Sequence, residues 1–261
     1  MVAGSLDGDV NRCPRRSLHG CSPDGDGHDD ARDGGGLILA SLTRRVEPRL
    51  LVVIAVVCAA LWGVIHLGSE VGEGDTVGFD RGVFLLFRQT TDHNLPVGPL
   101  WLRETARDIT ALGGFTVLTL VTIAAVAVLL VYDRRRQALV FALTAVAAQL
   151  LSEAAKHFVG RERPSFVTQY DMTSSSSFPS GHSMMAPAVY FTLAAIVAAG
   201  ELRRGARRML MAGSVVLVVA IGVSRVYLGV HWPTDVVAGW ALGSAIALVA
   251  WVALQQGRRA V

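Results

Sequence analysis

Long apolar runs alternate with short polar stretches from residue 50 onward, and six of these runs have the length of a membrane-spanning helix. They cover residues 50–68, 109–132, 138–157, 183–200, 209–227 and 234–254. A helix needs about 20 apolar residues to cross roughly 30 Å of hydrocarbon. Backbone groups in lipid must be satisfied within the segment, and the alternation of a β-barrel is missing, so the runs are interpreted as helices. The pattern predicts an all-α, polytopic bundle of six transmembrane helices over residues 50–254.

The two ends of the chain lack this pattern. Residues 1–36 are rich in Gly, Asp, Arg and Ser and poor in apolar residues. Such a composition cannot bury enough apolar surface to offset the entropy of folding. We therefore expect a disordered N-terminal tail, then a basic cytoplasmic lead-in at 37–49, and a short cytoplasmic C-terminal tail at 255–261.

Arginines gather at alternate ends of the six runs and predict the orientation of the protein. The clusters are Arg44, Arg45 and Arg49; Arg134, Arg135 and Arg136; Arg203, Arg204, Arg207 and Arg208; and Arg258 and Arg259. Basic loops stay on the cytoplasmic side of a membrane. We expect a multi-pass protein of the plasma membrane with both termini in the cytoplasm. The opposite face then receives residues 69–108, 158–182 and 228–233.

The first of these outer segments contains the stretches FDRGVFLLFR and PLWLRETARD. Both have the apolar spacing of short helices that lie in the membrane interface. An ordered loop packed over the bundle is the other interpretation, and the sequence does not decide between them.

Composition narrows the class of function. The chain is 52% hydrophobic and 17% charged, with a formal net charge of +3. It has no Lys/Arg-rich face with interleaved aromatic residues, so nucleic acid is not an expected partner. Its three cysteines have neither zinc-binding nor disulfide-framework spacing, and Cys58 lies in an apolar run as a core or lipid-facing residue. The pattern does not predict an oligomeric state.

Three cations are predicted at the outer ends of the apolar runs. They are Lys156, which is the only lysine in the chain, Arg163 and Arg225. Cations near lipid are costly unless they are paired, and Glu162 and Asp235 are too few to pair with all three. The expected partner is therefore an external polyanion such as phosphate, which arginine binds with a planar fork and lysine with a point charge.

Two histidines and a helix start add catalytic chemistry to these cations. Ser180 and Gly181 stand where a helix begins, and free backbone N–H groups there favour an anion, so no metal is required. A phosphoryl group can pass to an imidazole nitrogen and then to water. We expect His231 to attack, Asp235 to fix its tautomer, and His182 to protonate the leaving oxygen.

Each of these residues taken alone also has a structural explanation. Lys156 and Arg163 can extend to the lipid headgroups. Ser180 can be a helix N-cap, and Asp235 can complement a helix dipole. His157 is interpreted as structural or interfacial. Only the joint occurrence of the others on one face favours a catalytic site.

The three motifs together resemble the type 2 phosphatidic acid phosphatase (PAP2) superfamily. The pattern K-x6-RP is Lys156 to Arg163-Pro164, the PSGH motif is residues 179–182, and SR-x5-H-x3-D is Ser224-Arg225 to His231 to Asp235. The resemblance covers roughly residues 50 to 254 and implies a metal-free phosphatase without a cofactor. It implies His231 as nucleophile, Asp235 as its orienting residue and His182 as general acid. It implies phosphate binding by Lys156, Arg163, Ser180, Gly181 and Arg225.

The resemblance implies an integral membrane lipid phosphatase with its site at the extracytoplasmic face. The expected substrate is a phosphatidate, a phosphatidylglycerol phosphate or a polyprenyl diphosphate, and residues 165–178 are a candidate lid. A lipid phosphotransferase and a nonenzymatic membrane protein on the same fold are the alternatives. Soluble relatives that bind vanadate and oxidise halides are disfavoured, because they lack the membrane spans.

Overall fold

The computed structural model describes residues 48–164 and 176–256, and this part of the chain is helical. Its elements are α2 (Pro48–Glu73), α3 (Val77–Leu85), α4 (Leu100–Ala111), α5 (Phe115–Val131), α6 (Arg135–Val159), α7 (Gly181–Ala198), α8 (Arg204–Tyr227) and α9 (Pro233–Gln256). The predicted all-α fold is confirmed. The predicted tail at 1–36, most of the lead-in and most of the predicted lid lie outside the described residues.

Five helices, α2, α6, α7, α8 and α9, are long and apolar enough to cross a membrane. A sixth span forms if α4 and α5 count as one bent pair, since they meet at an angle of 45°. The prediction of one continuous helix over 109–132 is therefore wrong. The chain breaks at Gly113 and Gly114, where helix propensity is low and where a Cβ on Gly113 would overlap the side chain of Ile221.

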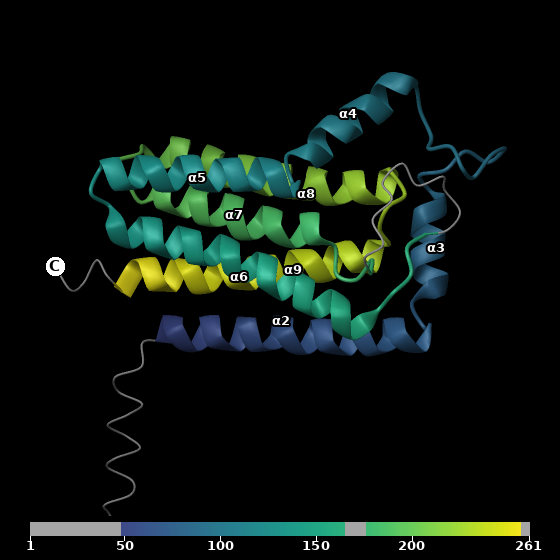
Figure 1. Ribbon diagram of the computed structural model, residues 1–261, viewed down its shortest axis with the longest axis horizontal. Helices are drawn as coiled ribbons and strands as arrows, with labels where there is room; N and C mark the ends of the chain where they lie inside the picture. Colours follow the sequence, from purple (N-terminus) through teal and green to yellow (C-terminus); the bar gives the residue numbers. More distant parts are fainter. Residues whose placement is uncertain (1–47, 165–175, 257–261) are drawn as a thin grey trace, which may run out of the picture. The chain divides into compact units, whose positions relative to one another are not determined.

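Successive long helices run in opposite directions through the bundle (Figure 1). As a result the end of α6, the start of α7, the end of α8 and the start of α9 lie at one end, which is also the end covered by α3. All three sequence motifs fall at these helix ends. The alternation thus places residues separated by up to 80 positions in sequence into one region.

Helix α2 contributes mainly an outer surface to the bundle. Only 6% of the 18 most apolar consecutive residues of this helix are buried, and Trp62 and Ile65 are exposed. Cys58 is exposed on the same helix. Exposed apolar side chains on a helix of this length fit contact with lipid, which favours the lipid-facing interpretation of this cysteine.

Helix α7 is the central helix, and it packs closely against α9 through small residues. A Cβ on Gly239 would lie 2.8 Å from the carbonyl oxygen of Ser180, and a Cβ on Gly243 would overlap the carbonyl oxygen of Met184. The two glycines form a GxxxG pattern, which lets helix backbones touch within a membrane. This contact fixes the start of α7 beside the start of α9.

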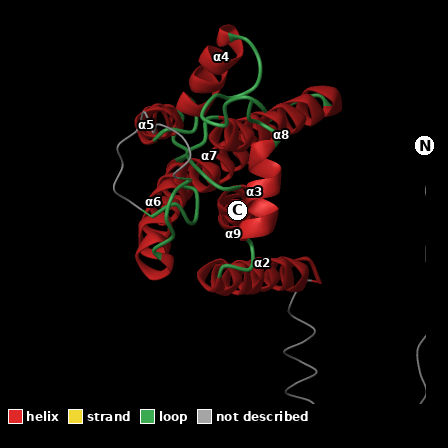
Figure 2. Ribbon diagram, turned by 90° about the vertical axis from the view of Figure 1, so that its right-hand side faces the viewer, coloured by secondary structure: helices red, strands yellow, loops and turns green. Residues whose placement is uncertain are grey.

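Of the two interpretations left open for the stretches within residues 69–108, the structure has helices, α3 and α4. Helix α3 stands across the end of the bundle and packs on α9 (Figures 1 and 2). The segment that follows is anchored by Arg88, whose Nη2 donates to the carbonyl oxygen of Tyr227 at 3.1 Å. A cation at the end of a helix also complements its dipole. Burial lowers the pKa of Arg88 to about 10, so this group stays charged at neutral pH.

Candidate active site

His231 lies in the turn between α8 and α9 and is 2% exposed. Its Nδ1 is 2.9 Å from the carbonyl oxygen of Ser177 and 3.5 Å from Oδ2 of Asp235. A carbonyl oxygen only accepts hydrogen bonds, so Nδ1 must carry the proton. In the neutral ring the lone pair then sits on Nε2. The nearer hydrogen-bond partner of Nδ1 is therefore the carbonyl oxygen of Ser177, and the carboxylate of Asp235 is the more distant one.

Ser177 is itself held in place by the backbone that precedes Pro164. Its N–H donates to the carbonyl oxygen of Arg161 at 2.8 Å, and its hydroxyl donates to that of Glu162 at 3.2 Å. These two bonds, made by the N–H and the hydroxyl of Ser177, fix the carbonyl group of Ser177 that faces His231.

Asp235 lies in the first turn of α9 and is fully buried. Its Oδ2 accepts the N–H of Trp232 at 2.8 Å, as a carboxylate at this position does in a capping box. Its backbone carbonyl accepts the N–H of Ser180 at 3.0 Å. The residue thus joins the start of α7 to the start of α9, beside His231.

Burial lowers the pKa of the His231 imidazole from 6.5 to about 4, and the charges of Arg225 and Arg163 add to this effect. The hydrogen bond and the charge of Asp235 act in the opposite direction. The imidazole is therefore neutral at pH 7, the state in which Nε2 has a free lone pair. Because the unfolded chain binds this proton at higher pH than the folded one, the group makes the protein less stable as pH falls from about 6.5 toward 4.

The PSGH motif caps α7. Ser180 is the N-cap, and its Oγ accepts the N–H of Ser183 at 3.4 Å and the hydroxyl of Ser183 at 3.0 Å. Gly181 opens the helix, and a Cβ there would lie 3.7 Å from Nζ of Lys156. The capping interpretation of Ser180 is confirmed, and it coexists with a cationic group at the same helix start. Helix N-termini favour anions.

Lys156 pairs with Glu153, whose Oε1 is 2.9 Å from the lysine Nζ. The expectation that the three cations lack enough acidic partners is wrong for this lysine. The spacing of three residues on one helix face brings the two groups together. Glu153 is half-exposed, so this pair is weak enough for an anion to compete with it.

Arg163 and Arg225 approach the histidines from two different elements. Nη1 of Arg163 donates to the carbonyl oxygen of Val230, the residue before His231, at 3.1 Å. Nη1 of Arg225 donates to Oγ1 of Thr110 at 3.2 Å. Both charges act on His231. The end of α8 and the segment after α6 thus surround the buried imidazole with positive charge.

His182 lies in the first turn of α7, against the break between α4 and α5. A Cβ on Gly114 would lie 3.6 Å from its Nε2, so the break makes room for the ring. The positive charges of Arg225, Lys156 and Arg163 interact electrostatically with the His182 ring, and His231 also interacts with it. The structure therefore brings together all eight residues singled out from the sequence.

The structure adds four residues to this region that the sequence reasoning missed. They are Asp80, Arg161, Ser177 and Thr234. Arg161 was visible as an extra arginine inside K-x6-RP, and Asp80 as a lone acid within an apolar helix. No sequence signal distinguished Ser177 from its neighbouring serines. Within the described residues, no group of three His, Cys, Asp or Glu side chains is arranged to hold a metal ion.

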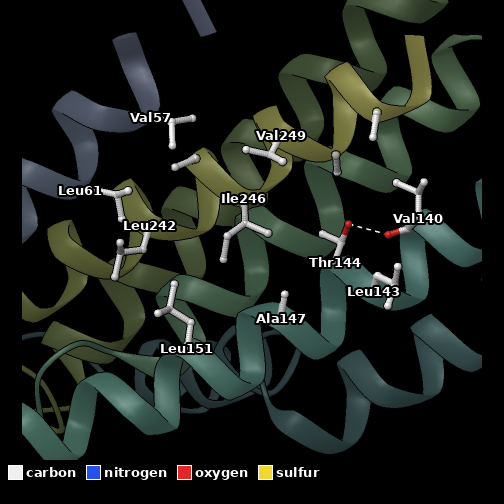
Figure 3. Close-up of a pocket in the computed structure, with 13 residues that line it drawn as sticks. Val57, Leu61, Val140, Leu143, Thr144, Ala147, Leu151, Leu242, Ile246 and Val249 are labelled. Carbon is white, nitrogen blue, oxygen red and sulfur yellow. Dashed lines mark hydrogen bonds between the residues drawn. The ribbon is translucent and has the colours of Figure 1, made fainter. Parts of the chain in front are cut away.

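An apolar groove of about 400 Å³ runs between α2, α6 and α9 (Figure 3). Its side chains include Leu61, Leu151 and Leu242. The hydroxyl of Thr144 donates within its own helix to the carbonyl oxygen of Val140 at 2.7 Å, so it presents no free donor to the groove. Leu151 directly precedes Ser152 and the turn of Lys156. On α6 and α9 the groove lining ends at Leu151 and Leu242, which are about one to two helical turns from Lys156 and Asp235.

These features define a multi-pass membrane protein with a buried histidine beside the N-terminus of a helix and three cationic side chains. Residues 137–259 match the PAP2 superfamily. The chain is 36% identical to phosphatidylglycerophosphatase B of Bacillus subtilis over 144 residues, which are 55% of this chain and 70% of that protein. It is 33% identical to the undecaprenyl-diphosphatase of Sulfolobus acidocaldarius over 135 residues, 49% of this chain and 61% of that protein.

The fold agrees with these matches. A crystal structure of a transmembrane PAP2-type phosphatidylglycerolphosphate phosphatase from Bacillus subtilis superposes with a TM-score of 0.66 and 27% identity. The superposition covers 78% of this chain and 96% of that one. The chain belongs to the PAP2 superfamily, and it is a membrane phosphatase.

Proposed function

We propose that this protein hydrolyses a phosphomonoester or a diphosphate of a membrane lipid through a phosphohistidine at His231. The observation that carries the proposal is the bond from Nδ1 to the carbonyl oxygen of Ser177 at 2.9 Å. That bond leaves the lone pair on Nε2 of a neutral imidazole. Lys156, Arg163 and Arg225 supply the positive charge that a phosphate requires.

The proposed reaction has two displacements at phosphorus. Nε2 of His231 forms a bond to phosphorus while the bond from phosphorus to the leaving oxygen breaks, and His182 gives its proton to that oxygen. Water oxygen then forms a bond to phosphorus while the bond from phosphorus to Nε2 breaks, His182 takes the proton from this water, and inorganic phosphate leaves the neutral His231. Asp235 offsets the positive charge that the His231 ring carries while it is phosphorylated. Cationic side chains and the N-terminus of α7 stabilise the phosphoryl oxygens.

The proposed orientation places this site at the extracytoplasmic face of the plasma membrane. Arg134 directly precedes α6, Arg135 and Arg136 lie in its first turn, and Arg203 and its neighbours lie at the start of α8. Both sets are at the end of the bundle opposite to α3 (Figure 1). Basic clusters on one side of the membrane favour the cytoplasm for that side.

A panel of lipids tests the activity and narrows the substrate. Purified protein is given a phosphatidate, a phosphatidylglycerol phosphate and a polyprenyl diphosphate, with and without EDTA, and inorganic phosphate is measured. We expect phosphate release from at least one lipid at a rate that EDTA leaves unchanged, since side chains supply the cations. Loss of activity in EDTA contradicts the metal-free mechanism, and no release from any lipid contradicts the hydrolase.

The same assay separates hydrolysis from transfer. A phosphotransferase passes the phosphoryl group from His231 to a hydroxyl of a second molecule in place of water. Mass spectrometry of the products then finds a phosphorylated acceptor in place of inorganic phosphate. We expect inorganic phosphate to account for all the substrate consumed.

We further propose that one hydrocarbon chain of the substrate lies in the groove of Figure 3. Ala147 is exposed on the groove wall, and a tryptophan there would fill it. We expect Ala147→Trp to lower kcat/KM about tenfold for dioleoyl phosphatidate and to leave that for dihexanoyl phosphatidate unchanged, because only the long chain reaches the groove.

Val146→Trp is the matched control. Val146 is exposed on the same helix but does not line the groove. Equal effects of both variants, or an equal effect of Ala147→Trp on both lipids, would contradict a chain-binding role for the groove.

A further inference from the structure

Arg161 joins two buried carboxylates that come from helices far apart in sequence. Its Nη2 donates to Oδ2 of Asp80 at 2.6 Å, and its Nη1 donates to Oδ1 of Asp235 at 2.6 Å. Both aspartate side chains are 0% exposed, and the arginine side chain is 10% exposed. A planar guanidinium is suited to two such bonds at once, and a lysine is not.

Two threonines complete the hydrogen bonds of this cluster. The N–H of Thr234 donates to Oδ1 of Asp80 at 2.9 Å, and its hydroxyl donates to Oδ2 at 2.7 Å. Arg161 also approaches Oγ1 of Thr234 at 2.7 Å and Oγ1 of Thr76 at 3.4 Å. Asp80 on α3 thereby caps the first turn of α9. Buried charges are tolerated when each has such partners.

The cluster reaches the proposed nucleophile through Asp235. One oxygen of that carboxylate is bound by Arg161, and the other lies 3.5 Å from Nδ1 of His231. Arg161 therefore fixes one oxygen of Asp235, while the N–H of Trp232 and the imidazole lie at the other. Without this bond Oδ1 loses its charged partner, and the carboxylate is held by the N–H of Trp232 and the imidazole at Oδ2.

The charge of the cluster also differs from that of a simple ion pair. Arg161 and Asp235 alone would cancel, and Asp80 adds a second negative charge, so the cluster as a whole carries one negative charge. The surroundings of His231 are otherwise positive. The groups that act on the two histidines come from α6, α7, α8, α9 and the segment before Pro164: Lys156, His182, Arg225, Asp235 and Arg163.

We propose that Asp80 and Arg161 are positioning residues for catalysis, which hold Asp235 toward His231 and keep a net negative charge behind the imidazole. This inference rests on the proposed phosphohistidine mechanism. In the phosphorylated state the ring is positive, and the extra negative charge stabilises it where a neutral Arg–Asp pair would not. The role is exerted through Asp235, because neither residue contacts the reacting atoms.

The alternative is that these bonds only fasten α3 to α9. Asp80→Asn tests the two roles, because the amide oxygen still accepts the N–H of Thr234 and so keeps α3 joined to α9, while the charge, the bond to Arg161 and the acceptor of the Thr234 hydroxyl are lost. We expect kcat for dihexanoyl phosphatidate to fall about tenfold. KM and the inhibition constant of inorganic phosphate should stay within about twofold, because the phosphate cradle is intact.

The pH profile is the readout that a fastening role would not change. Removing a negative charge disfavours the protonated ring, so the pKa of His231 falls further in Asp80→Asn. The acidic limb of kcat/KM is then expected at lower pH than in the wild type. Arg161→Lys, which retains the charge but not the two-pronged geometry, is expected to lower kcat about thirtyfold without this displacement of the limb.

The effects of the two substitutions are expected to be non-additive, since both act through Asp235. In the double variant Asp80→Asn/Arg161→Lys, kcat should fall by less than the product of the two single effects. Asp75→Asn is the matched control, because it removes an equal charge from an exposed residue of the α2–α3 turn. It should leave kcat and the pH profile unchanged.

Three results would overturn the inference. They are an unchanged kcat in Asp80→Asn, a loss of kcat that matches a loss of folded protein in thermal melts, and a rise in KM at constant kcat. The proposed function fails in a different way. If the wild-type protein and a His231 variant release phosphate equally, the phosphohistidine mechanism is wrong; if only the His231 variant is inactive and Asp80→Asn equals the wild type, the positioning role alone is wrong.

Discussion

Replacing His231 by asparagine lowers phosphate release by about 10⁴-fold or more, because a covalent mechanism has no path without its nucleophile. Asparagine is chosen because its amide N–H can still donate to the carbonyl oxygen of Ser177, which accepts from Nδ1 in the wild type. The fold and the cationic cradle are thereby kept. The measurement is the release of inorganic phosphate from the best lipid of the panel.

Trapping the intermediate gives a second measurement of this variant. Wild-type protein quenched during turnover of a phosphate-labelled lipid should carry label that is lost in acid and retained in alkali, as expected of a phosphoimidazole. The His231→Asn protein should carry none. His157→Asn is the control, since His157 is exposed at the end of α6. Undiminished activity of His231→Asn, or label that persists in it, contradicts the assignment of the nucleophile.

Replacing Gly243 by alanine separates α7 from α9 and is expected to have the largest effect on stability. A Cβ at this position would overlap the carbonyl oxygen of Met184 and lie 2.5 Å from Cγ of Pro187. Overpacking of this kind costs about 1 to 3 kcal/mol. The shift also moves the PSGH turn relative to His231, and a displacement of about 1 Å can lower the rate about a hundredfold. Thermal melts and phosphate release measure the two effects.

Gly213→Ala is the matched control for this substitution. Gly213 lies within α8, and a Cβ there would meet nothing within 4 Å. Alanine is a better helix former than glycine by about 1 kcal/mol, so this variant should be as stable as the wild type or more so. A Gly243→Ala protein that melts and turns over like Gly213→Ala would show that the contact between α7 and α9 does not position the site.

The helices and the gathering of the site at one end could be predicted because both follow from simple periodic constraints. Lipid requires apolar runs of a set length, and antiparallel spans bring alternate connections to one face. The break at Gly113 and Gly114 was not predictable in this way. It depends on what packs there, namely Ile221 and His182, and hydropathy does not report such contacts.

The partners of buried charges were the least predictable part of the site. Glu153 was passed over as the partner of Lys156, although the two lie on one helix face. Asp80 was not connected to the site because the position of α3 across the end of α9 depends on tertiary packing. Ser177 acts through a backbone carbonyl, which every residue has. Its contact with His231 is therefore invisible in the identity of the side chain.

The bonds of Ser177 to Arg161 and Glu162 have a consequence for the engineering of this protein. They join the chain before residue 165 to the chain after residue 175, so the described residues on either side form a fixed base at that point. Insertions, deletions and exchanges between the two ends of this base need not disturb the carbonyl that sets the histidine tautomer. The position is thus suited to grafting, where a different stretch of chain is joined to the two ends of an unchanged base.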